Sequence, residues 1–383
     1  MSVFTRLSDL SLEAFAALCE QSTSAADYPH CSDVQRNILI YQASTLHTAL
    51  AADPKALMSE LHRAFRHGPG VVVVQQAFAD TAVIDRHSAV FEHILHEEAQ
   101  HGAAADHFAK AGANGRIWNS LQKAAIQSPE SFIEYYCNPL LGLLAEAWLG
   151  PYYQVTAQVN VVRPGGVAQQ PHRDYHLGFQ TVEVLEHYPL DVQVMSQYLT
   201  LQGAVAHTDM PVESGPTQLL PFSQQYDMGF MAWRDPAFIE YFQGHAVQLP
   251  LRKGDLLFFN PALFHAAGTN RTEHQHRMAN LLQISSAFGK AMETLDHDRM
   301  MLALYPSLLA QLEQQTLDAE GLKAVIATAA QGYSFPTNLD SDPPLKGLAP
   351  MTGQQLFHLA LSERWSMDAF AREVEAMREK RRA

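Results

Sequence analysis

The spacing of hydrophobic residues changes character twice along this 383-residue chain. Up to about residue 150, apolar residues recur mostly every three or four positions, which predicts helices over Val34–Leu50 and Pro54–Phe65. A run of β-branched residues, Gly70–Gln75, interrupts this pattern and predicts one buried strand. The helical pattern then returns over Asp80–Ala105 and Ser128–Leu149.

From Tyr152 to about Ser286, apolar and polar residues alternate instead, and Gly and Pro separate the alternating segments. The predicted strands are Gln154–Val162, Gln193–Val205, Asp255–Asn260 and Met278–Ser286. A short helix is expected between strands at Asp235–Gln243. Several strands without long helices between them favour an antiparallel barrel or a double-sheet jelly roll.

Beyond Lys290 the chain reads as helical again, and a Pro-rich loop, Phe335–Pro350, is a candidate lid. The predicted helices are Met300–Gln314, Asp318–Ala330, Gly353–Leu361 and Met367–Arg381. We therefore expect one integrated domain in three parts. Residues 1–150 form a helical region with one strand, 151–289 a jelly-roll catalytic core, and 290–383 a helical extension.

Charge and composition narrow the class of partner. The formal net charge is -14, with 26 Lys and Arg against 40 Asp and Glu, which disfavours binding to nucleic acid or to anionic membranes. No apolar run approaches the roughly 18 residues of a membrane helix. Asp9 and Glu13 within the N-terminal apolar pattern argue against a signal peptide. Three widely spaced cysteines fit a reducing compartment, so we expect a cytoplasmic protein that acts on a small molecule.

The most informative motif is His172-Arg-Asp174. Side chains two apart on an extended segment point to the same face, so this imidazole and this carboxylate face one site. Together they supply two of the three ligands of a facial triad, which leaves positions open for small ligands and favours non-haem Fe(II). Because histidine is a common metal ligand, the question is which of the 19 histidines completes the triad.

His265 is the best candidate for the third ligand, because it ends the strongly apolar segment that begins at Lys253. Arg277 follows twelve residues later and leads the next predicted strand, so it can lie near His265 inside the barrel. A buried arginine needs an anion, and its planar fork matches a carboxylate. A carboxylate-bearing cosubstrate that chelates the iron would satisfy it.

These residues together resemble the phytanoyl-CoA dioxygenase family of Fe(II)- and 2-oxoglutarate-dependent oxygenases. The resemblance runs from about Gly70 to Ser286 and is carried by four segments in order. They are His172-Arg-Asp174, Asp209–Ser223, Lys253–His265 and Arg277.

The resemblance implies a double-stranded β-helix, a cupin-like jelly roll, flanked by the N- and C-terminal helical regions. It implies Fe(II) held by His172, Asp174 and His265, and the cosubstrate 2-oxoglutarate anchored by Arg277. The expected activity is a dioxygenase that uses O2 to oxidise a small organic substrate, with hydroxylation as the default outcome. Gln158 and Asn160 are polar residues within a strand pattern, and we expect them to face the barrel interior and contact the cofactor.

Other interpretations of the histidines stay open on spacing alone. His207-Thr-Asp209 repeats the His-x-Asp pattern, and the helical segment His93–His101 carries half of a di-iron carboxylate pattern. His176 is close enough to the metal motif to line the pocket or to form a structural hydrogen bond. Two alternative functions also remain: a cupin-like metalloenzyme that works without 2-oxoglutarate, and a non-catalytic jelly-roll binding protein.

Overall fold

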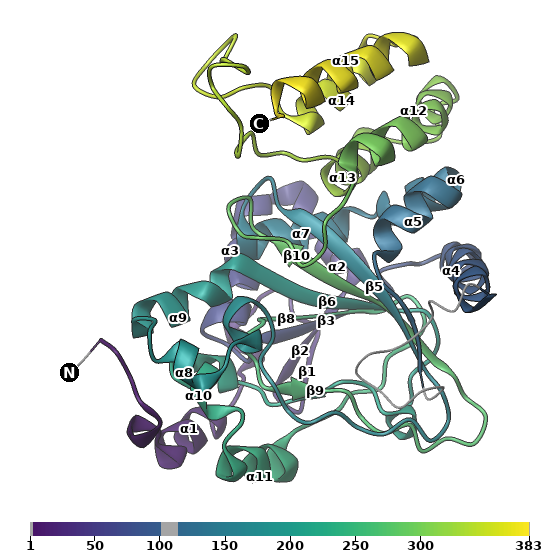
Figure 1. Ribbon diagram of the computed structural model, residues 1–383. Coiled ribbons are helices and arrows are strands. Elements are labelled where there is room, and N and C mark those ends of the chain that lie inside the picture. Colours follow the sequence, from purple (N-terminus) through teal and green to yellow (C-terminus); the bar gives the residue numbers. More distant parts are fainter. Residues whose placement is uncertain (1–2, 101–113, 383) are drawn as a thin grey trace.

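A large, mostly antiparallel sheet forms the centre of the computed structural model, which describes residues 3–100 and 114–382 (Figure 1). Its strand order is β1-β2-β3-β8-β6-β10-β5-β4, and only the β2–β3 pair is parallel. The strands of the large sheet are β1 (Asp33–Gln35), β2 (Ile38–Gln42), β3 (Val71–Gln75), β4 (Asn114–Ile117), β5 (Gln154–Val162), β6 (Thr200–Ala206), β8 (Leu256–Phe259) and β10 (Arg277–Ser285).

Helices cover one face of this sheet and flank it on both sides (Figure 1). Helices α2, α3 and α7 lie over the sheet, and α12 to α15 form a further layer above them. The helices are α1 (Leu12–Cys19), α2 (Ala43–Ala52), α3 (Pro54–Arg66), α4 (Ala82–Gln100), α5 (Ser120–Gln127), α6 (Pro129–Tyr136), α7 (Pro139–Leu149), α8 (Val182–Leu185), α9 (Leu190–Ser196), α10 (Gly229–Ala232), α11 (Pro236–His245), α12 (His297–Glu313), α13 (Ala319–Ala329), α14 (Gly353–Ser362) and α15 (Met367–Lys380).

A second, much smaller β layer lies against the other face of the large sheet (Figure 1). It consists of β7 (Gln218–Leu219) and β9 (His265–Ala266), which pair antiparallel. Single bridges extend it on both sides, from His265 to His172 and from Leu219 to Val247. The predicted antiparallel-rich β core is therefore present, as part of a mixed α/β fold.

Alternation along the strands divides the large sheet into a helix face and an inner face. Val72 and Val74 pack into the large core beneath the helices, whereas Val71 and Val73 pack between the two β layers. Leu256 and Phe258 of β8 likewise face the helices, and Leu257 and Phe259 face inward. Because both faces are buried, these strands read as continuous apolar runs, as the Gly70–Gln75 prediction assumed.

Two sequence predictions of secondary structure were wrong. Val34–Leu50 was expected to be one helix, but residues 33–42 form the β1–β2 hairpin and only then does α2 begin. Arg36 and Asn37 both have positive φ values, 51° and 68°, which is typical of a tight two-residue hairpin turn. Gln193–Val205 was expected to be a strand, but α9 occupies its first part and β6 begins at Thr200.

The remaining predicted segments were closer to the structure. The strands predicted at Gln154–Val162 and Met278–Ser286 correspond to β5 and β10. Phe335–Pro350 contains no helix or strand and lies beside the C-terminal helices (Figure 1), and its role as a lid stays a prediction. Among the described residues, no helix is both long and apolar enough to cross a membrane.

A polar network is buried on the helix face of the sheet, around His207 at the end of β6. The His207 side chain contacts the hydroxyls of Ser88, at 2.8 Å from Nδ1, and Tyr135, at 2.9 Å from Nε2. Ser88 donates onward to the carbonyl of Ile84, and Tyr135 accepts a hydrogen bond from Asn280. These directions fit a neutral His207 that donates from Nδ1 and accepts at Nε2.

Burial lowers the pKa of His207 from its ordinary value of 6.5 to about 3. In the unfolded chain His207 therefore binds a proton as the pH falls through about 6.5, whereas in the folded protein it stays neutral at that pH. The contribution of His207 to the free energy of unfolding is therefore complete above pH 6.5, the pKa of an ordinary histidine. It is lost as the pH falls from there toward the pKa of about 3 in the folded protein. Between about pH 7 and about pH 5 we expect a loss of about 2 kcal/mol in the free energy of unfolding from this histidine.

The measurement is urea unfolding across this pH range for the wild type and for His207→Gln. The variant is expected to be less stable at neutral pH but to lose the part of the pH dependence that His207 contributes. His274→Gln, which changes a 93% exposed side chain, serves as the control and should keep the wild-type slope. Equal slopes for His207→Gln and the wild type would contradict this account.

Candidate metal centre

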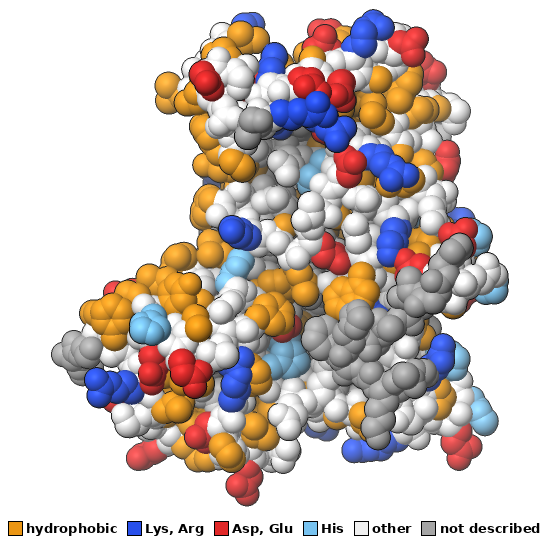
Figure 2. Space-filling view, in the orientation of Figure 1, with side chains coloured by type: hydrophobic (Ala, Val, Ile, Leu, Met, Phe, Trp, Pro, Cys, Tyr) orange, Lys and Arg blue, Asp and Glu red, His pale blue; other side chains and the backbone are white. Residues whose placement is uncertain are grey.

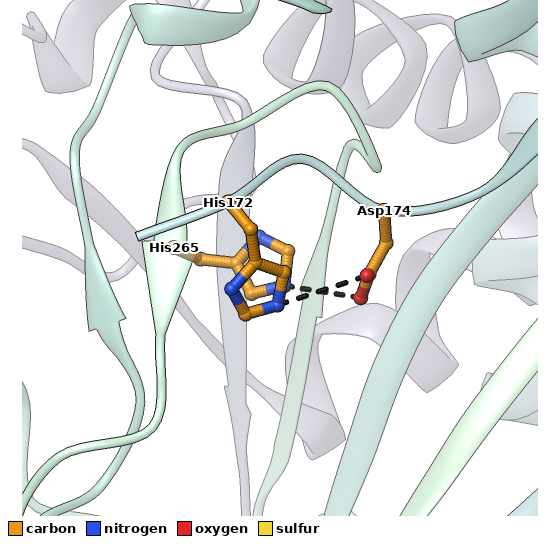
Figure 3. A group of neighbouring side chains, drawn as sticks. All are labelled: His172, Asp174 and His265. Carbon is orange, nitrogen blue, oxygen red and sulfur yellow. Dashed lines mark ion pairs between the residues drawn. The ribbon is translucent and has the colours of Figure 1, made fainter. Parts of the chain in front are cut away.

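Three side chains that could hold a metal ion meet on the inner side of the large sheet. His172 and Asp174 lie on the segment that follows β5, and His265 lies in β9. One candidate ligand atom from each side chain lies within 4.8 Å of the others. Figure 3 shows the two imidazole rings and the carboxylate directed toward a common space. The structure thus brings together the three residues that the sequence predicted as ligands.

Backbone pairing holds the two histidines side by side. The His172 N–H donates to the His265 carbonyl at 3.0 Å, and the His265 N–H donates to the His172 carbonyl at 3.2 Å. This reciprocal pair is the closely spaced hydrogen-bonded pair of an antiparallel ladder, with both side chains on the same face. One short stretch of β pairing therefore joins two segments that are far apart in the sequence.

Each imidazole is oriented by a hydrogen bond from its Nδ1 atom. His172 Nδ1 lies 2.8 Å from the carbonyl of Gln170, and His265 Nδ1 lies 2.9 Å from the carbonyl of Leu263. Because these carbonyls accept the Nδ1 proton, Nε2 of each ring is left as the lone-pair atom. The Nε2 atoms face Asp174, at 3.7 Å for His172 and 3.4 Å for His265.

Asp174 is held as a carboxylate between these rings and Gln202. Burial alone would raise the pKa of the Asp174 carboxyl. The electrostatic influence of the two neighbouring imidazoles and the hydrogen bond from Gln202 outweigh this and lower its pKa well below the usual range. Gln202, on the inner face of β6, donates from Nε2 to Asp174 Oδ2 at 2.7 Å. Burial and the neighbouring His265 also lower the pKa of His172, which favours its neutral form.

The intervening Arg173 points away from the metal centre, as alternation along an extended segment requires. Its buried guanidinium donates to the carbonyls of Ser223 and Tyr226, at 2.7 and 2.9 Å. It also lies over the rings of Phe230 and Phe264. Arg173 therefore anchors the His172–Asp174 segment from behind. After Asp174, Tyr175 and His176 turn the chain sharply, with φ values of 59° and 45°.

A cavity of about 830 Å³ opens beside the three side chains and is lined by the inner face of the sheet. Figure 2 shows a recess in the middle of this face of the molecule, with hydrophobic side chains around it. The sheet contributes alternate residues of three neighbouring strands, in agreement with the division of faces described above. From β5, β6 and β10 these are Gln158, Asn160, Val162, Gln202, Ala204, Ala206, Arg277, Ala279, Leu281 and Gln283.

Arg277 lines this cavity without a protein anion. Only 7% of the residue is exposed, and burial lowers the pKa of its guanidinium to about 10. Its Nη1 atom has no hydrogen-bond partner, and it forms no ion pair within residues 3–100 and 114–382. A buried guanidinium without an acceptor is costly, so an anionic ligand would stabilise this side chain.

The two predicted cofactor-contacting amides also line the cavity. Asn160 on β5 pairs with Ala279 on β10, which is two residues from Arg277 and faces the same side of the sheet. Its Oδ1 atom has no hydrogen-bond partner among the described residues. Gln158 pairs with Leu281, and its Oε1 accepts a hydrogen bond from Arg116 at 3.1 Å. Both therefore face inward as predicted. Contact with a cofactor stays a prediction for each of them.

The competing histidines lie elsewhere. His207 is on the helix face of the sheet, so the second His-x-Asp motif does not face the cavity. His176 hydrogen-bonds the hydroxyl of Thr200 at 3.2 Å and is absent from the cavity lining. His93 pairs with Glu97 on an exposed face of α4, and Glu98 pairs with Lys123. His101 lies outside the described residues.

Sequence reasoning missed several residues of the cavity, chiefly Gln202, Trp233 and Arg234. Gln202 carries the same signal as Gln158, a polar residue at an inward position of an apolar strand. That signal was hidden because the strand was placed too early in the sequence. Trp233 and Arg234 follow the short α10, and no periodic pattern indicates that this turn reaches the cavity.

Comparison with known proteins identifies the family of the chain that carries this site. The sequence profile described as Phytanoyl-CoA dioxygenase (PhyH) matches residues 58–279, which is more than half of the chain and includes the three candidate ligands. The chain belongs to the phytanoyl-CoA dioxygenase family. This confirms the resemblance drawn from the motifs. The iron and 2-oxoglutarate expected from the sequence are the cofactors of this family.

Two dioxygenases match part of the chain. Dioxygenase cdmD of Talaromyces verruculosus is 30% identical over 148 residues, which is 39% of this chain and 44% of that protein. Dioxygenase trt7 of Aspergillus terreus is 30% identical over 145 residues, which is 38% of this chain and 45% of that protein. The matched stretch thus spans less than half of the length of each relative.

Solved structures with distant similarity include two enzymes of nogalamycin biosynthesis. The epimerase SnoN, solved in complex with Fe3+, alpha ketoglutarate and nogalamycin RO, gives a TM-score of 0.43 at 21% identity, covering 61% of this chain and 85% of that one. The alpha ketoglutarate dependent carbocyclase SnoK gives a TM-score of 0.43 at 20% identity, covering 59% and 83%.

The hydrogen bond from Gln202 to Asp174 yields a test that does not depend on the substrate. Gln202→Leu removes the donor that fixes the carboxylate, so we expect Fe(II) affinity to fall about tenfold to hundredfold. The measurement is anaerobic equilibrium titration with Fe(II). Gln35→Leu, an exposed change on β1, is the control and should bind like the wild type. Unchanged affinity in Gln202→Leu would show that this contact does not support a metal ligand.

Proposed function

We propose that this protein is an Fe(II)- and 2-oxoglutarate-dependent dioxygenase that hydroxylates a small organic substrate. The observation that carries the proposal is the convergence of His172, Asp174 and His265 at a cavity that also contains the unpaired Arg277. In this proposal the large sheet and the small β layer are the two sheets of the family's double-stranded β-helix.

The donor set fits non-haem iron. Two imidazole Nε2 atoms and one carboxylate make a 2-His-1-carboxylate set, which leaves coordination positions open for other ligands. The rings are already oriented by their Nδ1 hydrogen bonds, and the carboxylate by Gln202, so little reorganisation is needed to bind a metal.

The cavity also fits the cosubstrate. 2-Oxoglutarate carries two carboxylates, and Arg277 offers a buried, forked donor without a protein acceptor. Asn160 offers an inward amide nearby on β5. In this proposal Arg277 binds the carboxylate farther from the keto group, and His172, Asp174 and His265 hold the metal that the keto acid chelates.

When bound, iron and 2-oxoglutarate supply the oxidising power. The substrate C–H bond becomes C–OH, while 2-oxoglutarate and O2 yield succinate and CO2 together with the inserted oxygen atom. The residues of this chain do the rest: they fix three ligands, anchor the cosubstrate and orient the substrate. The apolar side chains of the cavity wall, such as Leu257, Phe259 and Leu281, limit the access of water to the reacting atoms.

Binding of 2-oxoglutarate to the iron-loaded protein under anaerobic conditions should produce a visible metal-to-ligand charge-transfer band. We expect His172→Ala to lose this band, because removal of one ligand weakens metal binding. His187→Ala, which changes an exposed side chain on the segment after α8, is the matched control and should keep it. Absence of the band in folded, iron-loaded wild type would contradict the 2-oxoglutarate part of the proposal.

Arg277 can be tested separately from the metal. Arg277→Gln removes the charge-assisted, forked contact, so we expect the Kd for 2-oxoglutarate to rise about tenfold to hundredfold while Fe(II) affinity stays the same. Arg277→Lys should fall between this variant and the wild type, because it keeps the charge but not the fork. The readout is titration of the charge-transfer band. An unchanged Kd in Arg277→Gln would assign the carboxylate to another residue.

A further inference from the structure

Arg234 also lines this cavity, on a different element from Arg277. Arg234 follows α10, two residues before α11 begins, and its guanidinium lies 3.7 Å from the centroid of the Trp233 ring. Arg234 Nη2 donates to the Gly178 carbonyl at 3.0 Å. Gly178 belongs to the short helical turn 176–179, which directly follows Tyr175. The pair is therefore fixed to the segment that leads away from the metal ligand Asp174.

Both side chains carry a buried donor that lacks an acceptor. Arg234 Nη1 and Trp233 Nε1 have no hydrogen-bond partner among the described residues, and both residues line the cavity. Burial lowers the pKa of Arg234, and its guanidinium takes part in no ion pair within the described part of the chain. Two adjacent unsatisfied donors form an incomplete hydrogen-bonding site.

The cavity itself offers no acidic group to complete this site. Among its described lining residues, Asp174 is the only carboxylate, and its oxygens face His172, His265 and Gln202. Arg277 on β10 is already matched by the single far carboxylate of the proposed cosubstrate. The acceptor for Arg234 and Trp233 therefore has to arrive with a second molecule.

The remainder of the cavity wall is suited to an apolar body. Phe179 and Val167 line the cavity and are 55% and 68% exposed, so they present apolar surface at its rim. Leu257 and Leu281 line its interior from the sheet. Exposed apolar side chains at a cavity are typical of a binding surface for an apolar ligand.

We propose that the primary substrate is a largely apolar carboxylic acid whose carboxylate is bound by Arg234 and Trp233. The planar guanidinium and the adjacent indole N–H supply donors that a carboxylate can accept together. The body of the acid then lies against the apolar wall, beside the metal centre. This inference rests on the proposed function, because it assigns the second organic ligand of the same site.

The test uses 4-phenylbutyrate and its methyl ester as probes, each titrated calorimetrically into the anaerobic Fe(II)- and 2-oxoglutarate-loaded protein. The charge-transfer band is recorded first, so that failure of the proposed function is seen before either probe is added. We expect the acid to bind at least about tenfold more tightly than the ester, because only the acid is a charged acceptor.

Variants locate the contact. Arg234→Gln should weaken acid binding about tenfold to hundredfold, leave ester binding unchanged and leave the Kd for 2-oxoglutarate unchanged. Trp233→Phe, which keeps the ring but removes the N–H, should have a smaller effect in the same direction. Arg299→Gln, an exposed change on α12, is the charge-matched control and should bind both probes like the wild type.

Four results would overturn the inference. They are equal binding of acid and ester, no binding of the acid to protein that shows the band, full acid affinity in Arg234→Gln, and loss of 2-oxoglutarate affinity in Arg234→Gln. The last result would assign Arg234 to the cosubstrate. A wild type that lacks the band would instead count against the proposed function.

Discussion

The metal centre depends on one short stretch of β pairing, the reciprocal hydrogen bonds between His172 and His265. This pairing sets His172 directly beside His265, and the buried hydrogen bonds of Arg173 to the carbonyls of Ser223 and Tyr226 anchor the same segment from behind. The pair belongs to a small β layer that is built from very short pieces of strand. Such a layer is not stable alone, so it relies on the large sheet and the core between them.

The large sheet contributes to function through the division of its two faces. Residues facing the helices make the main hydrophobic core and hold buried polar groups such as His207 in structural hydrogen bonds. Residues facing inward either pack beneath the small β layer or line the cavity. A shift of one residue in the register of β10 would move Arg277 and Gln283 out of the cavity. The site is thus specified by the same alternation that builds the core.

Much of the site was predictable because its signals are local. His172 and Asp174 are two residues apart on an extended segment, and Arg277 begins a strand whose alternation is regular. The role of Arg234 was not predictable, because it follows from a contact with Gly178 and from the position of a turn after a helix of four residues. Gln202 was missed because the strand that carries it was predicted to begin at Gln193, whereas β6 begins at Thr200.

The fold shows the same contrast. Strands with regular alternation, such as β5 and β10, were predicted closely, whereas the β1–β2 hairpin was taken for the start of a helix. Its turn residues, Arg36 and Asn37, do not carry the glycine that usually marks such a turn. The two-residue strands of the small β layer are too short to show any period, so only tertiary structure reveals them.

The most direct test of the central claim is a crystal structure of the protein with Fe(II) and 2-oxoglutarate, prepared without oxygen and recorded with anomalous data at the iron edge. We expect one iron peak, bound by Nε2 of His172, Nε2 of His265 and a carboxylate oxygen of Asp174, with 2-oxoglutarate extending to Arg277. An iron peak elsewhere, or 2-oxoglutarate bound without contact to that iron, would contradict the central claim.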